Sequence, residues 1–245
     1  MKLNINPAKG QKLLGRIVLG TAVLALLPHL ARSYDINEGL RVGNMATSNS
    51  AVGYSSLVLG SYNSSGYGDN RLTVGNGNTL TCYSGAGTIA VGSYNYLVAY
   101  NGFMFGNSHM NTSGSNSMLT GSANSCASYN AFSYGANNQI SSTAAGAMAG
   151  GSYNIAEGEN SVALGRFVSA KTFASVVIGQ YNATGTAEDD YSAKYSWRPT
   201  DPLFVVGNGT AVTPKNAMVI TKDGTVTIDR VPARGGISMG SFTAP

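Results

Sequence analysis

The chain reads Asn160-Ser161-Val162-Ala163-Leu164-Gly165 and, 14 residues after that segment, Ser175-Val176-Val177-Ile178-Gly179. Both segments contain the unit apolar–any–apolar–Gly. The unit recurs along the chain with a commonest spacing of 14 residues and insertions of one to three. Its copies end at Gly60, Gly75, Gly92, Gly106, Gly121, Gly135, Gly165, Gly179 and Gly207, with weaker ones at Gly43 and Gly151. A 14-residue period is too short for helical repeats or a propeller blade and is typical of a β-solenoid.

Each repeat predicts the parts of one solenoid turn. The apolar unit predicts a short strand, and its glycine permits the positive φ that a sharp turn requires. An asparagine, which also tolerates that conformation, recurs three residues after the glycine. These residues are Asn63, Asn78, Asn95, Asn124, Asn138, Asn154 and Asn182. We expect their side chains to form a ladder along the stack, and a second strand, such as Val168 to Thr172, to return the chain.

Composition supports an all-β protein. Gly, Ser and Asn fill 83 of the 245 positions, and these residues disfavour helices, so a helical bundle or a coiled coil is excluded. The chain is 43% hydrophobic, which argues against disorder. Residues 34–245 carry ten basic and eleven acidic side chains, so the mature chain has no excess of positive charge that would favour nucleic acid as a partner.

The first 33 residues are interpreted as a secretion signal. A basic stretch to Arg16 precedes the apolar run Ile17 to Leu27 and the small-residue pattern Ala31-Arg32-Ser33. The run is shorter than the roughly 20 residues of a spanning helix, although an uncleaved anchor is the alternative. We expect a chain that is secreted or displayed at a bacterial cell surface.

The repeat in residues 40–182 resembles the head of trimeric autotransporter adhesins, on the strength of Asn160 to Gly165 and Ser175 to Gly179. The resemblance implies a left-handed parallel β-roll that forms a homotrimer. Residues 201–220 are similar to a module that closes such rolls. The stalk and membrane anchor that follow these heads do not appear in the 245 residues.

The repeat predicts four regions: a signal peptide (1–33), a β-roll head (34–182), a non-repeat cap or loop (183–200), and a closing β module with a tail (201–245). The third region contains the only tryptophan, Trp197. We expect Trp197 to be buried in an end cap, the alternative being a projecting recognition loop. In the fourth region, two β-rich runs flank Asp223-Gly224 between Met218 and Ile228, which predicts a hairpin.

Catalytic, cofactor and metal sites are not predicted. His109 is the one histidine after residue 33, and it occupies the asparagine position three residues after Gly106, so we interpret it as a turn residue. Cys82 and Cys126 lie about three turns, or roughly 14 Å, apart, which is too far for a disulfide. The protein is therefore expected not to be an enzyme.

Candidate binding residues come from two patterns. Gly-x-Tyr-Asn recurs with Tyr62, Tyr94, Tyr153 and Tyr181, and a tyrosine column suits carbohydrate or protein binding, although turn packing is the simpler explanation. Asn160 and Ser161 carry the best match to the adhesin heads, some of which bind matrix, and Trp197 belongs to the alternative recognition loop.

Two functions follow as expectations. The first is a secreted, non-enzymatic, adhesin-like protein that binds extracellular matrix, polysaccharide or cells. The alternative is a structural subunit of an extracellular filament that associates end to end. In either case the flanking residues of each unit, such as Val176 and Ile178, are expected to fill the core of the chain. The residue between them, such as Val177, is expected to face another subunit.

Overall fold

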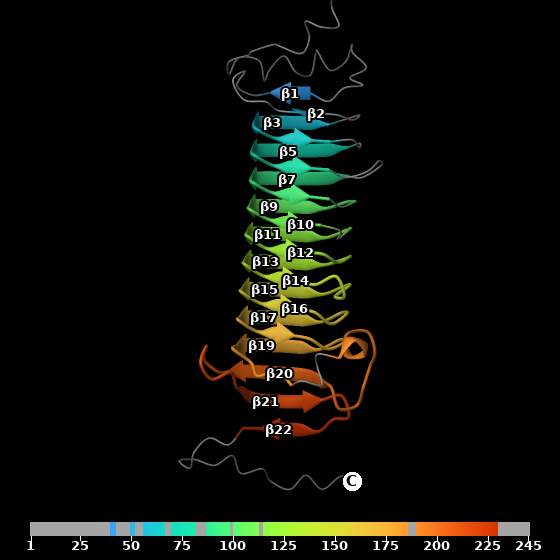
Figure 1. The fold of residues 1–245 in the computed structure, drawn as a ribbon, viewed down its shortest axis with the longest axis vertical. Coiled ribbons are helices and arrows are strands. Elements are labelled where there is room, and N and C mark those ends of the chain that lie inside the picture. The colour runs from blue at the N-terminus through green and yellow to red at the C-terminus, as the bar shows by residue number, and fades with distance from the viewer. Residues whose placement is uncertain are drawn as a thin grey trace, which may run out of the picture.

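The structure is a computed structural model that describes residues 40–42, 50–51, 56–66, 70–81, 87–98, 100–112, 115–185 and 190–229. Within these ranges the chain is almost entirely β-structure, wound as a parallel solenoid (Figure 1). The signal expected in 1–33, the tail after residue 229, and Gly43, Cys82, Glu188 and Asp189 lie outside the described residues. No helix in the described part of the chain is long and apolar enough to cross a membrane.

Two sheets run along the solenoid. The larger contains β1 (Leu40–Val42), β3 (Leu57–Ser61), β5 (Arg71–Asn76), β7 (Thr88–Ser93), β9 (Phe103–Asn107), β11 (Met118–Ser122), β13 (Phe132–Ala136), β15 (Met148–Ser152), β17 (Val162–Arg166), β19 (Val176–Gln180), β20 (Pro202–Asn208), β21 (Asn216–Thr221) and β22 (Val226–Ile228). The smaller contains β2 (Ser50–Ala51), β4 (Ser64–Ser65), β6 (Thr79–Leu80), β8 (Tyr96–Leu97), β10 (Met110–Asn111), β12 (Ser125–Cys126), β14 (Gln139–Ile140), β16 (Ile155–Ala156) and β18 (Ser169–Ala170).

The repeated units pair with one another in the order in which they occur. Strands β1 to β20 of the larger sheet are parallel neighbours, and the glycines that end the units align, as Gly165 does with Gly179 and Gly179 with Gly207. The predicted all-β solenoid is therefore confirmed.

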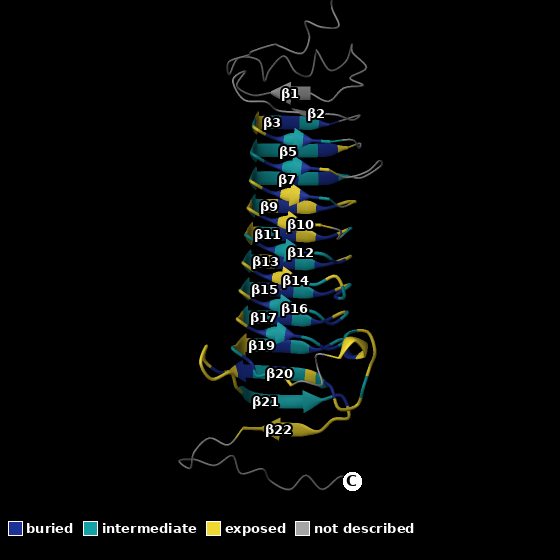
Figure 2. Cartoon of the chain, in the orientation of Figure 1, coloured by how far each residue is buried: buried dark blue, intermediate teal, exposed yellow. Residues whose placement is uncertain are grey.

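The side chains of the larger sheet point the opposite way from the sequence-based expectation. The middle residue of each unit is buried: Val58, Thr73, Ala90, Met104, Leu119, Ser133, Ala149, Ala163, Val177 and Val205 are at most 3% exposed. The flanking residues, such as Val176 and Ile178, are only half-buried (Figure 2). The expectation that Val177 faces another subunit is therefore wrong, because that residue belongs to the core of its own chain.

The thin core explains this orientation. In most turns each sheet buries one residue, and the two buried residues are seven positions apart in the sequence. A large side chain in one sheet often accompanies a small one in the other. Examples are Met104 with Asn111, Leu119 with Cys126, and Ser133 with Ile140. Protein interiors are close-packed, so a core this narrow has no room for two large residues from the same strand. The large flanking residues consequently face outward.

The predicted asparagine ladder is present from Asn63 to Asn154 and is buried within the turns. It does not extend to Asn182, because Val168 follows Asn154 in the ladder and Asn182 bonds the backbone of Ser169 instead. Oδ1 of Asn124 accepts from the backbone N–H and from Nδ2 of Asn138, at 3.0 Å each. Nδ2 of Asn138 also donates to the carbonyl oxygens of Tyr134 and Gly151. The ladder thus satisfies backbone groups that the tight turn leaves without strand partners.

His109 replaces asparagine in this ladder, as the sequence predicts. Its backbone N–H donates to Oδ1 of Asn95, and its Nδ1 accepts from the backbone N–H of Asn124 at 3.2 Å. Its Nε2 lies 3.2 Å from the carbonyl oxygen of Phe105, so the neutral Nε2–H form satisfies both ring nitrogens. Burial lowers the pKa of His109.

The C-terminal strands close the solenoid. After a 3-10 helix (Tyr191–Lys194), β20 pairs parallel to β19, β21 pairs antiparallel to β20, and β22 pairs antiparallel to β21. The last two strands form the predicted hairpin, with Gly224 at a positive φ of 87°.

Candidate functional site

The outward apolar face of the larger sheet is the most extensive candidate surface. We define this face by two columns. The first contains Leu57, Leu72, Ile89, Phe103, Met118, Phe132, Met148, Val162, Val176 and Phe204. The second contains Leu59, Val74, Val91, Phe105, Thr120, Tyr134, Gly150, Leu164, Ile178 and Val206. Eighteen of these twenty positions are apolar or aromatic, the exceptions being Thr120 and Gly150.

The face remains continuous at its irregular points. A Cβ on Gly150 would lie 2.2 Å from a ring carbon of Tyr134, so the tyrosine ring covers the place where Gly150 lacks a side chain. At the C-terminal end, Ile220 and Met218 of β21 pair with Phe204 and Val206. Val226 and Ile228 of β22 continue the same two columns.

The predicted tyrosine column lies along a different edge, where the chain leaves the larger sheet. Tyr62, Tyr94, Tyr153 and Tyr181 all adopt positive φ values, between 41° and 59°. The side chains of Tyr62 and Tyr94 are 59% and 65% exposed, so they are available to a ligand.

Sequence reasoning missed Phe167 and Arg166 in this column. The ring of Phe167 stacks between Tyr153 and Tyr181, with centroids 4.6 and 4.8 Å away. The guanidinium of Arg166 lies 5.3 Å from the Phe167 centroid and 5.8 Å from that of Tyr181. Phe167 could have been found from its place two residues after Gly165. Stacking covers the faces of its ring, so this part of the column is packed, whereas Tyr62 and Tyr94 are more open.

Asn160 and Ser161 have different environments. Asn160 is exposed and has a positive φ of 55°, whereas the hydroxyl of Ser161 is buried. Asn160 therefore can reach a ligand at the surface, and Ser161 is enclosed.

A second asparagine ladder lies at the surface and was not predicted. Nδ2 of Asn101 donates to Oδ1 of Asn116, whose Nδ2 donates to Oδ1 of Asn130. These residues stand two positions before an outward apolar residue, as Asn160 does. That position was the available signal.

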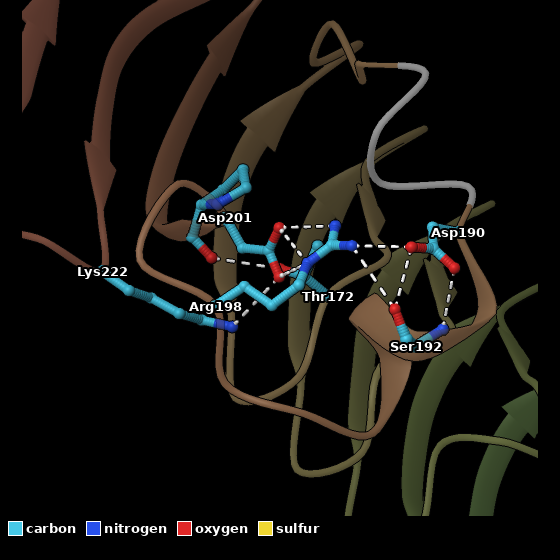
Figure 3. A network of polar contacts seen from close by, with 7 residues as sticks. Thr172, Asp190, Ser192, Arg198, Asp201 and Lys222 are labelled. Atoms are coloured by element: carbon cyan, nitrogen blue, oxygen red, sulfur yellow. Dashed lines mark hydrogen bonds and ion pairs between the residues drawn. The ribbon is translucent and has the colours of Figure 1, made fainter.

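The non-repeat region forms a polar clamp against the hairpin (Figure 3). Arg198 donates to both carboxylate oxygens of the buried Asp201 at 2.9 to 3.1 Å and to Asp190 at 2.7 Å. The ammonium of Lys222, whose side chain is fully buried, lies 3.8 Å from Asp201 and 5.6 Å from the ring centroid of Phe173. Burial lowers the pKa of Lys222, and the charge of Asp201 opposes that shift.

Trp197 lies beside this clamp in the sequence but is not part of a buried cap. Its side chain is 57% exposed, so the expectation of a buried tryptophan is wrong. The clamp residues close this end of the chain through ion pairs rather than through an aromatic side chain. Trp197 is consequently accessible to a partner.

The described residues contain no group of three His, Cys, Asp or Glu side chains arranged to hold a metal ion. His109 uses both ring nitrogens within the ladder. Cys126 is buried and free, and burial raises the pKa of its thiol. Neither side chain is placed to act on a bound molecule.

Comparisons with protein-family models, with curated proteins and with solved structures find no match for this chain.

Proposed function

We propose that the protein is a secreted, non-enzymatic, adhesin-like surface protein whose chains associate side by side through the outward apolar face. The observation that carries this proposal is the length of that face. Its twelve strands with described side chains, from β3 to β22, span about 50 Å at the usual strand spacing. If the two columns together are about 11 Å wide, the face covers roughly 600 Å².

An apolar surface of this size favours association. Monomeric proteins rarely expose contiguous apolar patches above a few hundred Å². A stable interface typically buries about 800 Å² on each partner. The face approaches that area, and a second copy of the chain offers the same flat apolar columns. We therefore take other copies of this chain as the occupant.

The finer features of the proposal come from the resemblance to adhesin heads. It supplies three as the number of subunits and the left-handed sense of the roll, whereas the 14-residue turn is proposed from the spacing of the repeats. An apolar face on each chain is compatible with three copies around a common axis. Stacked tyrosines and asparagines on the remaining edges would then form repeated arrays, which favour multivalent binding to polymers such as matrix proteins or polysaccharides.

Tyr62 and Tyr94 are the proposed contacts because they are the most exposed rings of their column. Between Tyr62 and Tyr94 the column has Gly77, which has no side chain. One side of the Tyr94 ring therefore lies against the backbone of Gly77, where a Cβ would be 2.9 Å from the ring. Exposed tyrosine combines apolar area with a hydroxyl at low conformational cost.

Binding of the purified chain to immobilised matrix proteins and polysaccharides tests this function. We expect saturable binding that Tyr94→Ala weakens about tenfold through loss of an aromatic contact from each copy. Tyr96→Ala is the matched control, because Tyr96 is 42% exposed but lies on the smaller sheet. Equal loss in both variants would refute the role of the column, and no saturable binding to any surface would refute the adhesin proposal.

A further inference from the structure

The larger sheet has two end strands, β1 and β22, and each has a single strand neighbour among the described residues. We propose that copies of this chain join end to end, with β22 of one copy pairing with β1 of the next. The proposal is independent of association through the apolar face, because it uses backbone groups at the sheet edges. It gives a structural basis to the alternative function as a filament subunit.

Strand direction permits such a junction. Strands β1 to β20 are parallel, β21 reverses direction, and β22 reverses it again. Because of these two reversals, β22 runs in the same direction as β1. A second copy stacked below β22 in Figure 1 would therefore continue the parallel sheet without inverting the molecule.

The backbone of β22 has groups available for this pairing. The N–H of Asp229 donates to the carbonyl of Ala217 at 3.0 Å, and the N–H of Thr221 donates to that of Thr225 at 2.9 Å. In an antiparallel pair, hydrogen-bonded and non-hydrogen-bonded residues alternate. Val226 and Ile228 are thus the residues whose N–H and C=O groups point away from β21, as on an edge strand that templates pairing.

The sequences of the two edge strands match in register. Val226-Thr227-Ile228 continues the columns of the apolar face at its C-terminal end. At the other end Leu40-Arg41-Val42 is in register with Leu57-Val58-Leu59, so it occupies the same columns. Pairing β22 with β1 would therefore place apolar residues beside apolar residues and extend the face through the junction.

Two oppositely charged residues would lie near each other at this junction. Arg41 would occupy the position opposite Thr227, and Asp229 lies two residues further along, on the same side of its strand as Thr227. The carboxylate of Asp229 is about half-exposed, and among the described residues the ammonium of Lys215 lies 3.9 Å from it. Arg41 and Asp229 would then be diagonal neighbours across the junction, a separation that a long side chain can span.

Ile228→Pro tests the junction directly. Proline removes an outward N–H, and edge strands tolerate it at such positions. Ile228→Ala is the matched control, since it also loses the apolar side chain but keeps the donor. The chain is purified from its host, with whatever N-terminus processing in the host produces. We expect electron microscopy to show long fibres for wild type and for Ile228→Ala. Ile228→Pro should give short rods, with the junction constant reduced five- to thirtyfold.

A charge exchange provides a second test that does not depend on proline. Arg41→Asp and Asp229→Lys should each shorten the fibres, and the double variant should restore them. Discrete rods for the wild-type chain at every concentration would overturn the proposal. This holds even if residues before 40 or after 229 are what covers the edges. Fibres of unchanged length in Ile228→Pro would overturn it as well. Loss of side-by-side association through the apolar face would change the mass per length of a fibre, whereas loss of the end-to-end junction would change its length. The two modes of association can therefore be distinguished.

Discussion

Replacing Asn138 by alanine is expected to destabilise the solenoid locally and measurably. Oδ1 of Asn138 accepts from the buried backbone N–H of Asn154 at 3.0 Å, and Nδ2 donates to Asn124 Oδ1 and to two carbonyl oxygens at 2.8 to 3.1 Å. Alanine supplies none of these partners. A buried group left without a partner costs about 1–3 kcal/mol, and the two carbonyls retain some alternatives.

We therefore expect the free energy of unfolding to fall by about 2–5 kcal/mol, and Tm to fall by about 4–20 °C for a chain of this length. Urea unfolding and hydrogen exchange at the amide of Asn154 measure the effect. Asn138→His is the matched variant, because His109 shows that a neutral imidazole satisfies the next backbone N–H and a carbonyl in the same ladder. A loss below about 1 kcal/mol for alanine, or an equal loss for histidine, would refute the account of the ladder.

Three further outcomes are expected. Burial lowers the pKa of His109, so the unfolded chain binds more protons than the folded chain below about pH 6.5. The stability contributed by His109 should therefore be complete above that pH and fall as the pH drops toward the folded-state pKa. Melting at a series of pH values should show this loss, and His109→Asn should remove it. Val177→Asp should unfold the neighbouring turns rather than release intact subunits, at a cost of several kcal/mol, and a folded, unassembled chain by circular dichroism would contradict this. Arg198→Met should destabilise the fold by removing the main partner of the buried Asp201, and it should cost more stability in urea unfolding than Lys222→Met. Equal costs would contradict the clamp geometry.

The order of strands and the ladder were predictable because they depend on local spacing. A glycine that ends each unit and an asparagine three residues later repeat in register, so any parallel stacking brings them into columns. The replacement of an asparagine by His109 in the ladder could be predicted for the same reason. The hairpin at Asp223-Gly224 was equally local.

The orientation of the strands was not predicted, because it depends on the width of the core. Val162 and Leu164 are larger than Ala163, so hydrophobicity alone assigned them to the interior. The glycine that ends the unit meets a separate requirement. Gly165 has a φ of +143°, and a Cβ there would come within 1.9 Å of the carbonyl oxygen of Gly179 in the next turn.

The candidate binding residues were only partly predictable. Tyr62 and Tyr94 are exposed as a binding column requires, but the stack of Phe167 with its neighbours needed the geometry of the turns. The exposure of Trp197 could not be inferred, because the non-repeat region has no periodic pattern that separates a buried side from an exposed one. Ion pairs close this region instead.

Sedimentation equilibrium of the purified chain tests the proposed role of the apolar face most directly, when Ile228→Pro is included to suppress end-to-end growth. The background chain should have three times the mass of one chain. Leu164→Asp, at a half-buried position in the middle of the face, should sediment as a folded single chain, while Gln139→Asp on the exposed smaller sheet should keep the larger mass. A stable, folded single chain without Leu164→Asp would contradict the account, as would an unchanged mass with it.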